Sequence, residues 1–162
     1  MTLPEFLRRW LVRKLENLRA ARVPDIVIGG VENPYMLRWW VIPRNRFFNI
    51  YHHVVLRSDD DRALHDHPWV SASIVVDGEV CEVLPGRRAR LLTAGRIVLR
   101  GARSAHRLET MPGQHYHSLF ITGPRTREWG FHCPQGWKHW KDFTGFRSTG
   151  DSTVIGPGCG ED

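Results

Sequence analysis

The sequence has no hydrophobic run long enough to cross a bilayer, and only three of its 162 residues are cysteine. A transmembrane helix needs about 20 consecutive apolar residues. Arginines interrupt the N-terminal segment, which also lacks the apolar core of a signal peptide. Cys81, Cys133 and Cys159 are odd in number and widely spaced, so they predict reduced thiols and no disulfide framework. These absences predict a cytoplasmic protein without membrane contact.

Acidic residues are in the minority, with 17 Asp and Glu against 23 Lys and Arg, so the net charge is +6. A basic balance can indicate phosphate binding, but the arginines are dispersed and form no recognised nucleic-acid motif. A small anionic ligand is therefore expected before a nucleic acid. The sequence also lacks repeats and low-complexity linkers. Its length and its seven tryptophans predict one compact domain.

An amphipathic helix is predicted over residues 3–20, because its apolar residues recur at three- and four-residue steps. These apolar residues are Phe6, Leu7, Trp10, Leu11, Leu15 and Leu18. Pro4 suits the first turn, and Pro24 prevents the helix from continuing. The apolar stripe is wide enough to need a protein surface, either the rest of this domain or the partner in a homodimer, in preference to a membrane.

Short strands are predicted along most of the remaining chain, after a turn at Gly29 and Gly30. The predicted strands cover residues 37–42, 47–57, 69–76, 79–84, 89–92, 96–100, 105–109, 117–122 and 127–132. Many short strands separated by turns predict a β-sandwich or barrel. The predicted organisation is a helix over residues 1–22, a β-barrel domain over 23–147 with a short turn or helix at 135–143, and a loosely ordered tail over 148–162. Residues 158–160 could fold back if the tail covers an opening.

Three histidines form the clearest candidate for a functional site. Residues i and i+2 of a strand face the same side, so His65 and His67 can present two imidazoles together while Asp66 faces away. A third imidazole must come from a neighbouring strand, and His106 follows 39 residues after His67. The alternative is that His65 and His67 are turn or loop residues and that His106 is a hydrogen-bonded histidine of the barrel.

These residues resemble the two motifs of the cupin superfamily, G-x5-H-x-H-x3,4-E-x6-G and G-x5-P-x-G-x2-H-x3-N. The matching residues are His65, His67, Gly78, Gly95 and His106. Ser71 stands where the first motif has glutamate. Residues 38–46, Trp69 and residues 121–131 are also similar to those of small cupin-like proteins of bacteria and bacteriophages. The resemblance implies an all-β, single-domain cupin jelly-roll barrel, here preceded by the amphipathic helix.

Two histidines, a missing carboxylate and a third histidine resemble the three-histidine cupins, of which thiol dioxygenases are the best known. The resemblance implies a divalent metal, with Fe(II) preferred, although Zn, Ni, Cu or Mn would accept the same ligands. It therefore implies an Fe(II)-dependent oxygenase that acts on a small polar or anionic substrate. The alternative is a non-oxidative cupin, either a sugar-nucleotide isomerase-type enzyme or a ligand-binding module without turnover.

Strand alternation predicts which other side chains face the cavity. Tyr51, His53 and Arg57 share one face of the strand that precedes the histidine motif. We expect Arg57 to bind an acidic group of the substrate, because a guanidinium offers planar bidentate donors, or else to pair with an aspartate of residues 59–61. Tyr51 and His53 would then be the nearby proton-transfer or hydrogen-bonding groups.

Further candidates follow from the later strands. Ser71 continues the face of His65 and His67, where it either contacts the substrate or fills a tapering barrel. His117 and Trp129 could line the floor or rim of the pocket. The opposite face of residues 69–76 is apolar, and it needs cover from the N-terminal helix or from a second subunit.

Overall fold

The computed structural model describes residues 1–29, 32–58, 63–111, 113–145 and 156–160. It begins with helix α1 (Glu5–Ala21), continues through short strands and ends with helix α2 (Trp140–Thr144). The strands are β1 (Ile26–Ile28), β2 (Met36–Trp40), β3 (Asn49–Val55), β4 (Leu64–His65), β5 (Ser71–Asp77), β6 (Glu79–Leu84), β7 (Arg88–Thr93), β8 (Ile97–Arg100), β9 (Arg107–Glu109), β10 (Tyr116–Thr122), β11 (Gly130–Cys133) and β12 (Gly136–His139). The acidic run at residues 59–61 lies outside the described residues.

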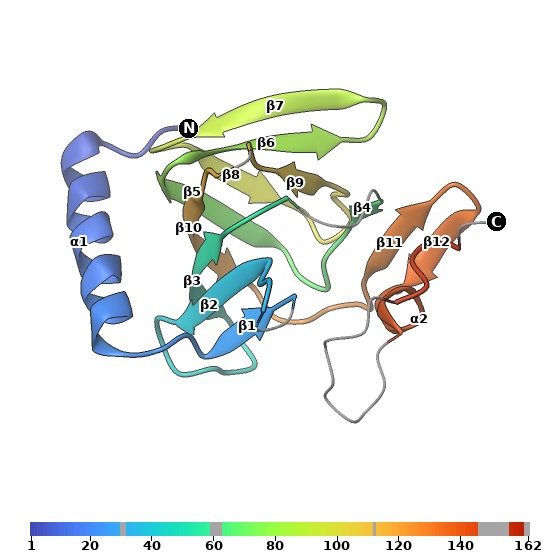
Figure 1. The fold of residues 1–162 in the computed structure, drawn as a ribbon, viewed down its shortest axis with the longest axis horizontal. Coiled ribbons are helices and arrows are strands. Elements are labelled where there is room, and N and C mark those ends of the chain that lie inside the picture. The colour runs from blue at the N-terminus through green and yellow to red at the C-terminus, as the bar shows by residue number, and fades with distance from the viewer. Residues whose placement is uncertain (30–31, 59–62, 112, 146–155, 161–162) are drawn as a thin grey trace.

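The strands form one large and two small antiparallel sheets (Figure 1). The large sheet has the order β1-β2-β3-β10-β5-β8, and the small sheets have the orders β7-β6-β9 and β12-β11-β4. This arrangement confirms the predicted β-rich architecture. The prediction of a turn or helix over residues 135–143 is wrong at its start, because residues 136–139 form β12 and pair with β11. A stretch of four residues is too short to show the two-residue period of a strand in the sequence, so only the pairing with β11 identifies β12.

Helix α1 lies on the outer face of the large sheet. Its residues Leu11, Val12 and Leu15 pack against an apolar cluster of the sheet. The sheet residues of that cluster are Ile50, Ile74, Val76 and Leu119. The helix therefore supplies the cover that the apolar face of β5 requires. Among the described residues, no helix has the length and apolar composition needed to cross a membrane.

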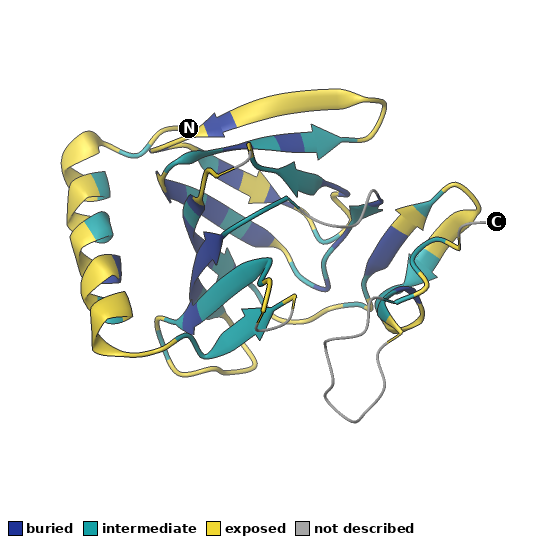
Figure 2. Cartoon of the chain, viewed as in Figure 1, coloured by how far each residue is buried: buried dark blue, intermediate teal, exposed yellow. Residues whose placement is uncertain are grey.

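The predicted apolar stripe of α1 is wrong for two aromatic residues. Phe6 is 71% exposed and Trp10 is 49% exposed, so neither is part of the packed surface (Figure 2). At about 100° per residue, Trp10 and Phe6 lie about 140° and 180° around the helix from the buried Leu15. Only the side that carries Leu11 and Leu15 can face the sheet.

The opposite, inner face of the large sheet combines an apolar core with polar side chains. The core cluster contains Val55, Val75, Val80, Leu92, Val98 and Tyr116. Strand β10 pairs with both β3 and β5, which places Ser118 opposite His53 and Phe120 opposite Ser73. The alternation predicted for the strand after the histidine motif is confirmed, because Val75 faces this core while Ile74 and Val76 face α1.

A disulfide joins Cys133 of β11 to Cys159, whereas Cys81 is a free cysteine. The prediction of three reduced thiols is therefore wrong. Residues 156–160 return to α2, where the backbone N–H of Gly158 donates to the carbonyl of Phe143 at 3.1 Å. This return brings together two cysteines that are 26 residues apart in sequence. Residues 156–160 fold back onto α2, and the other tail residues, 148–155 and 161–162, lie outside the described residues.

Substitutions on the two sides of α1 should differ in cost. Leu15→Ala should lower the free energy of unfolding by about 2–5 kcal/mol, because it removes a buried side chain from the helix–sheet contact. Trp10→Ala should change it by less than about 1 kcal/mol, because the ring is half exposed. Urea unfolding followed by far-UV circular dichroism measures both values. Equal losses would contradict this placement of the helix.

Candidate metal centre

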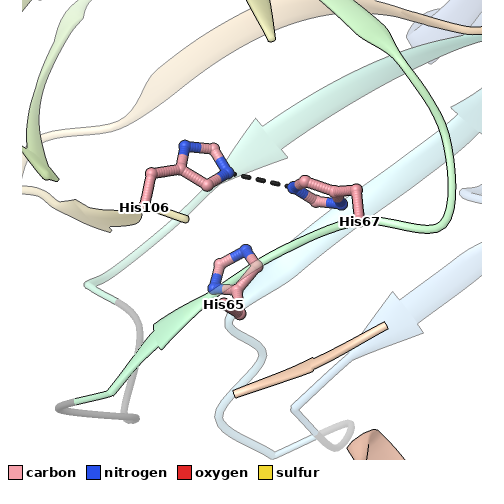
Figure 3. Close-up of side chains that lie close together, drawn as sticks. All are labelled: His65, His67 and His106. Atoms are coloured by element: carbon pink, nitrogen blue, oxygen red, sulfur yellow. Dashed lines mark hydrogen bonds between the residues drawn. The ribbon is translucent and has the colours of Figure 1, made fainter. Parts of the chain in front are cut away.

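The three histidines of the motif converge on one point inside the barrel (Figure 3). His65 ends the short strand β4 and pairs with His106 through two backbone hydrogen bonds, of 2.9 and 3.0 Å. His67 follows two residues later, and its backbone N–H donates to the carbonyl of Ala102. The structure therefore brings the third imidazole from a neighbouring segment, as the spacing predicted.

The ring nitrogens are close enough to share one ion. Nε2 of His67 lies 2.9 Å from Nε2 of His106, and one ring nitrogen from each histidine lies within 4.8 Å of the other two. Two nitrogens that bind one metal at about 2.0–2.1 Å and at a right angle stand about 3 Å apart. No carboxylate belongs to this group. The arrangement matches three imidazole ligands on one face of a divalent metal.

Glu82 of β6 fixes the orientation of the His106 ring. Nδ1 of His106 lies 2.7 Å from Oε1 of Glu82, and an ionised carboxylate can only accept, so Nδ1 carries the proton. The lone pair is then on Nε2, which points to the other histidines. Glu82 is fully buried and also accepts from Arg100 at 2.6 Å and from Arg90 at 2.6 Å. Such a carboxylate behind a histidine commonly sets the orientation and basicity of a metal ligand.

His67 and His106 are held neutral at physiological pH. Burial lowers the pKa of His106 to about 4, although the hydrogen bond to Glu82 opposes this shift. Burial, helped by the neighbouring His65 and His106, holds the pKa of His67 well below its usual range. Burial alone would raise the pKa of Glu82, but the hydrogen bonds from His106 and Arg100 bring it down to about 2. Neutral imidazoles are the form that binds a metal.

A cavity of about 90 Å³ adjoins the histidines on the inner side of the large sheet. Its lining includes His53, Trp69, Ser73, Tyr116, Ser118 and Phe120, together with the two arginines Arg38 and Arg100. Pockets for drug-sized ligands occupy about 300–1,000 Å³. The cavity therefore admits only a small molecule.

The two arginines of the cavity differ in how their charge is compensated. Arg100 is buried and pairs with Glu82, and it also donates to Oγ of Ser73 at 2.9 Å. Arg38 of β2 donates from Nε to Nε2 of His53 at 2.8 Å and lies 5.0 Å from the centre of the Tyr51 ring. Within the described part of the chain, no carboxylate forms an ion pair with Arg38. Burial lowers its pKa, but a guanidinium still stays charged.

Two of the predicted proton-transfer groups lie near this arginine, and the predicted clamp lies elsewhere. His53 lines the cavity, and Tyr51 stacks behind it with ring centres 5.9 Å apart. Arg57 is not in the cavity lining, because its Nε and Nη2 donate to the carbonyl of Asn33 at 3.4 and 3.1 Å. Strand β3 ends at Val55, so Arg57 no longer follows the alternation that placed it inside.

The remaining predicted residues lie around the site but not in it. Ser71 is buried on β5 without lining the cavity, and Ser73 takes the position nearer the histidines. His117 faces the crevice beneath α1, on the outer side of the sheet. Trp129 lies behind His65, with ring centres 6.4 Å apart, and stacks on Trp140.

Arg38, Glu82 and Arg100 are the site residues that sequence reasoning did not find. Each has a signal in the sequence, because each is a charged residue at an inward position of an otherwise apolar strand. Glu82 lies on the same face of its strand as the buried Val80, two residues before it, and Arg100 lies on the same face as the buried Val98. A charge in such a position needs a partner inside the barrel.

Asp66 faces away from the histidines on either side of it, as predicted. Its buried carboxylate accepts from the backbone N–H of Gly130 at 2.9 Å and from Nε1 of Trp137 at 3.1 Å, and it pairs with Arg127 at 2.9 Å. These bonds attach the β11–β12 hairpin to the segment that carries His65 and His67. The hairpin then forms the wall behind His65, with the Phe131 ring 5.8 Å from the His65 ring.

Comparison with known proteins identifies the fold. No protein-family model and no curated protein matches the sequence. Solved structures do match, among them a protein described as a putative mannose-6-phosphate isomerase from Ralstonia eutropha, at 17% identity and a TM-score of 0.51 over 62% of this chain and 92% of that one. The polyketide cyclase RemF from Streptomyces resistomycificus matches at 19% identity and a TM-score of 0.51, over 63% of this chain and 72% of that one.

A third match is an uncharacterised Klebsiella pneumoniae protein with a double-stranded β-helix domain, at 14% identity and a TM-score of 0.51 over 65% of this chain and 90% of that one. The double-stranded β-helix is the cupin jelly roll, so the predicted fold class is confirmed. At these identities the similarity shows the fold alone.

Removal of any one of the three histidines should abolish stoichiometric metal binding. His65→Ala, His67→Ala and His106→Ala each leave two nitrogens at the site, while the apolar core is unchanged. Metal content after dialysis, measured by mass spectrometry on proteins with intact circular dichroism, gives the result. His115→Ala, which removes an exposed histidine elsewhere, is the control. Unchanged metal content in His106→Ala would remove that residue from the ligand set.

Glu82→Gln should weaken both the fold and the site. The change leaves two arginines around a neutral amide, and breaking a buried pair typically costs about 3–5 kcal/mol. Loss of a carboxylate behind a ligand typically weakens metal binding by about 10–100-fold. Thermal unfolding and metal titration measure the two effects, and Glu79→Gln on the same strand is the control. A variant with normal stability and affinity would disprove the role assigned to Glu82.

Proposed function

We propose that this chain, which has the cupin fold, is an Fe(II)-dependent oxygenase of a small anionic substrate. The observation that carries the proposal is a cavity lined by three histidines, of which His67 and His106 are neutral, with no carboxylate in the ligand group and with a guanidinium that has no ion-pair partner among the described residues. Three histidines occupy only part of a metal's coordination sphere, which leaves open positions.

The residues present fit a ferrous ion. His65, His67 and His106 would hold it through their ring nitrogens, and Glu82 would keep Nε2 of His106 directed at the site. When bound, Fe(II) supplies adjacent open positions that accept dioxygen and a donor atom of the substrate.

The protein's own side chains would bind and orient the substrate. Arg38 offers a charged guanidinium in the lining of the cavity, where a carboxylate or similar anion would replace lost water contacts. His53 accepts from Nε of Arg38, and the Tyr51 ring lies beside the guanidinium, so these two residues position Arg38. In this arrangement His53 uses its Nε2 lone pair on Arg38, which assigns it to orientation and not to proton transfer. Trp69 and Phe120 would exclude water from the reacting groups.

A second candidate function is a non-oxidative reaction at the same site. Two structural neighbours, one described as an isomerase and one as a cyclase, favour it. The volume of about 90 Å³ argues against a sugar nucleotide, which needs a much larger pocket. The two candidates differ in whether substrate turnover consumes dioxygen.

Anaerobic loading with Fe(II) tests the proposal directly. We expect about one iron per chain, a nitric oxide adduct detectable by electron paramagnetic resonance, and oxygen consumption with at least one member of a panel of small thiols and carboxylates. Iron uptake without oxygen consumption across the panel would favour the non-oxidative alternative. Failure to take up iron, with tight uptake of another divalent metal, would refute the oxygenase.

Substitution of Arg38 tests the anion-binding role. Arg38→Gln should weaken binding of an anionic substrate by about 10–100-fold, the usual effect of losing a charge-assisted hydrogen bond, and should leave iron content unchanged. Arg57→Gln is the matched control, since Arg57 lies outside the cavity lining. Ligand binding is read from the change in the nitric oxide signal. An equal effect of the two substitutions would contradict the assignment to Arg38.

A further inference from the structure

The side of α1 that faces away from the sheet carries a defined set of aromatic and basic side chains. Phe6 and Trp10 are one helical turn apart, and they are 71% and 49% exposed (Figure 2). Arg13 and Lys14 are exposed beside them, and Arg13, Lys14 and Trp10 line a shallow groove together with Asn17. We call the four residues Phe6, Trp10, Arg13 and Lys14 the outer face of α1.

The charge of this face is largely uncompensated. Within the described residues, no acidic side chain forms an ion pair with Arg13 or Lys14. Glu5, the acidic residue of the first turn, pairs instead with Arg8 at 2.7 Å and with Arg9 at 3.0 Å. The face therefore combines two exposed aromatic rings with two cations that have no ion-pair partner in the described part of the chain.

The helix is held firmly enough to present this face. Leu15 is buried, and Nη1 of Arg8 donates to the carbonyl of Val76 at 2.9 Å, which ties the first turns of α1 to β5. The residues before the helix add backbone hydrogen bonds, from Leu3 to Gly95 and from Ile97 to Met1. Because the packed side of α1 is already used, its outer face needs a separate partner.

We propose that the outer face of α1 binds the surface of an anionic lipid bilayer, with the helix lying in the plane of the interface. A bilayer interface meets both chemical demands of this face. Aromatic rings settle at the headgroup level, and lipid phosphates and carboxylates attract lysine and arginine. The proposal replaces the expectation of no membrane contact, which assumed that Phe6 and Trp10 belonged to the packed stripe.

Two other partners satisfy only half of these demands. A second copy docked through the same face by two-fold symmetry would bring the Arg13 and Lys14 cations of both copies into one interface to which the outer face contributes no carboxylate. A nucleic-acid duplex would supply phosphates for the cations but no apolar phase for Phe6. The bilayer is the partner that accepts the rings and the cations together.

Vesicle flotation with the full chain tests the proposal. We expect co-flotation with phosphatidylcholine vesicles that contain phosphatidylserine, little with phosphatidylcholine alone, and loss of binding as salt is raised. Arg13→Gln combined with Lys14→Gln should weaken the partition onto anionic vesicles by about 10–30-fold. Phe6→Ser combined with Trp10→Ser should weaken it by at least about 10-fold. Circular dichroism confirms that each variant is folded.

Matched controls separate this face from net charge and from general hydrophobicity. Arg87→Gln combined with Arg103→Gln removes the same charge from exposed positions elsewhere, and Leu99→Ser removes a side chain that is 71% exposed on β8. Both controls should bind like the original chain. Absence of binding to anionic vesicles at low salt would overturn the proposal. Equal losses of vesicle binding in the control variants would also overturn it. The same holds if substitutions in the outer face abolish self-association or nucleic-acid binding and leave vesicle binding unchanged.

Discussion

The buried carboxylate of Glu82 holds together the parts of the barrel that form the candidate metal centre. It lies on β6 and receives hydrogen bonds from Arg90 on β7, from Arg100 on β8 and from His106, which precedes β9. A buried charge is tolerated only when its partners are complete, so these contacts fix the relative positions of the strands. The same network sets the tautomer of His106 and neutralises Arg100. Structure and site therefore depend on one carboxylate.

Asp66 performs the matching task on the other side of the histidines. Its carboxylate points outward between two inward imidazoles, just after β4 ends, and there it binds Gly130 and Trp137 of the neighbouring hairpin and Arg127, which precedes that hairpin. Asp66 is thus the sequence neighbour of two candidate ligands, and Glu82 is hydrogen-bonded to the third. Neither belongs to the ligand group itself. The ligand group keeps three imidazole donors, and the carboxylates behind it carry the negative charge.

Sequence reasoning placed correctly the residues whose positions follow from the repeat of side-chain direction along the local backbone. Alternation of two predicted that His65 and His67 face inward and that the opposite face of β5 needs the cover that α1 provides. The errors concern contacts between distant segments. Which arginine enters the cavity depends on where strands pair and end, and the bond between Cys133 and Cys159 depends on how residues 156–160 lie against α2. The spacing of apolar residues in α1 likewise cannot show which part of its wide apolar stripe packs against the sheet.

The difference between Arg38 and Arg100 decides what the proposed site would select. Arg100 meets a carboxylate of the protein, so its charge is cancelled before any ligand enters. Arg38 meets only a neutral imidazole and an aromatic ring among the described residues, so its charge is available. A divalent ion on the three histidines would add further positive charge to the same small cavity, and an anion would compensate the charges of the ion and of Arg38. Anion and metal should therefore strengthen each other's binding by the same factor, because coupling between two sites is reciprocal. In this proposal the ion-pair partners of the arginines, more than the number of arginines, would set the charge of the ligand that the cavity binds.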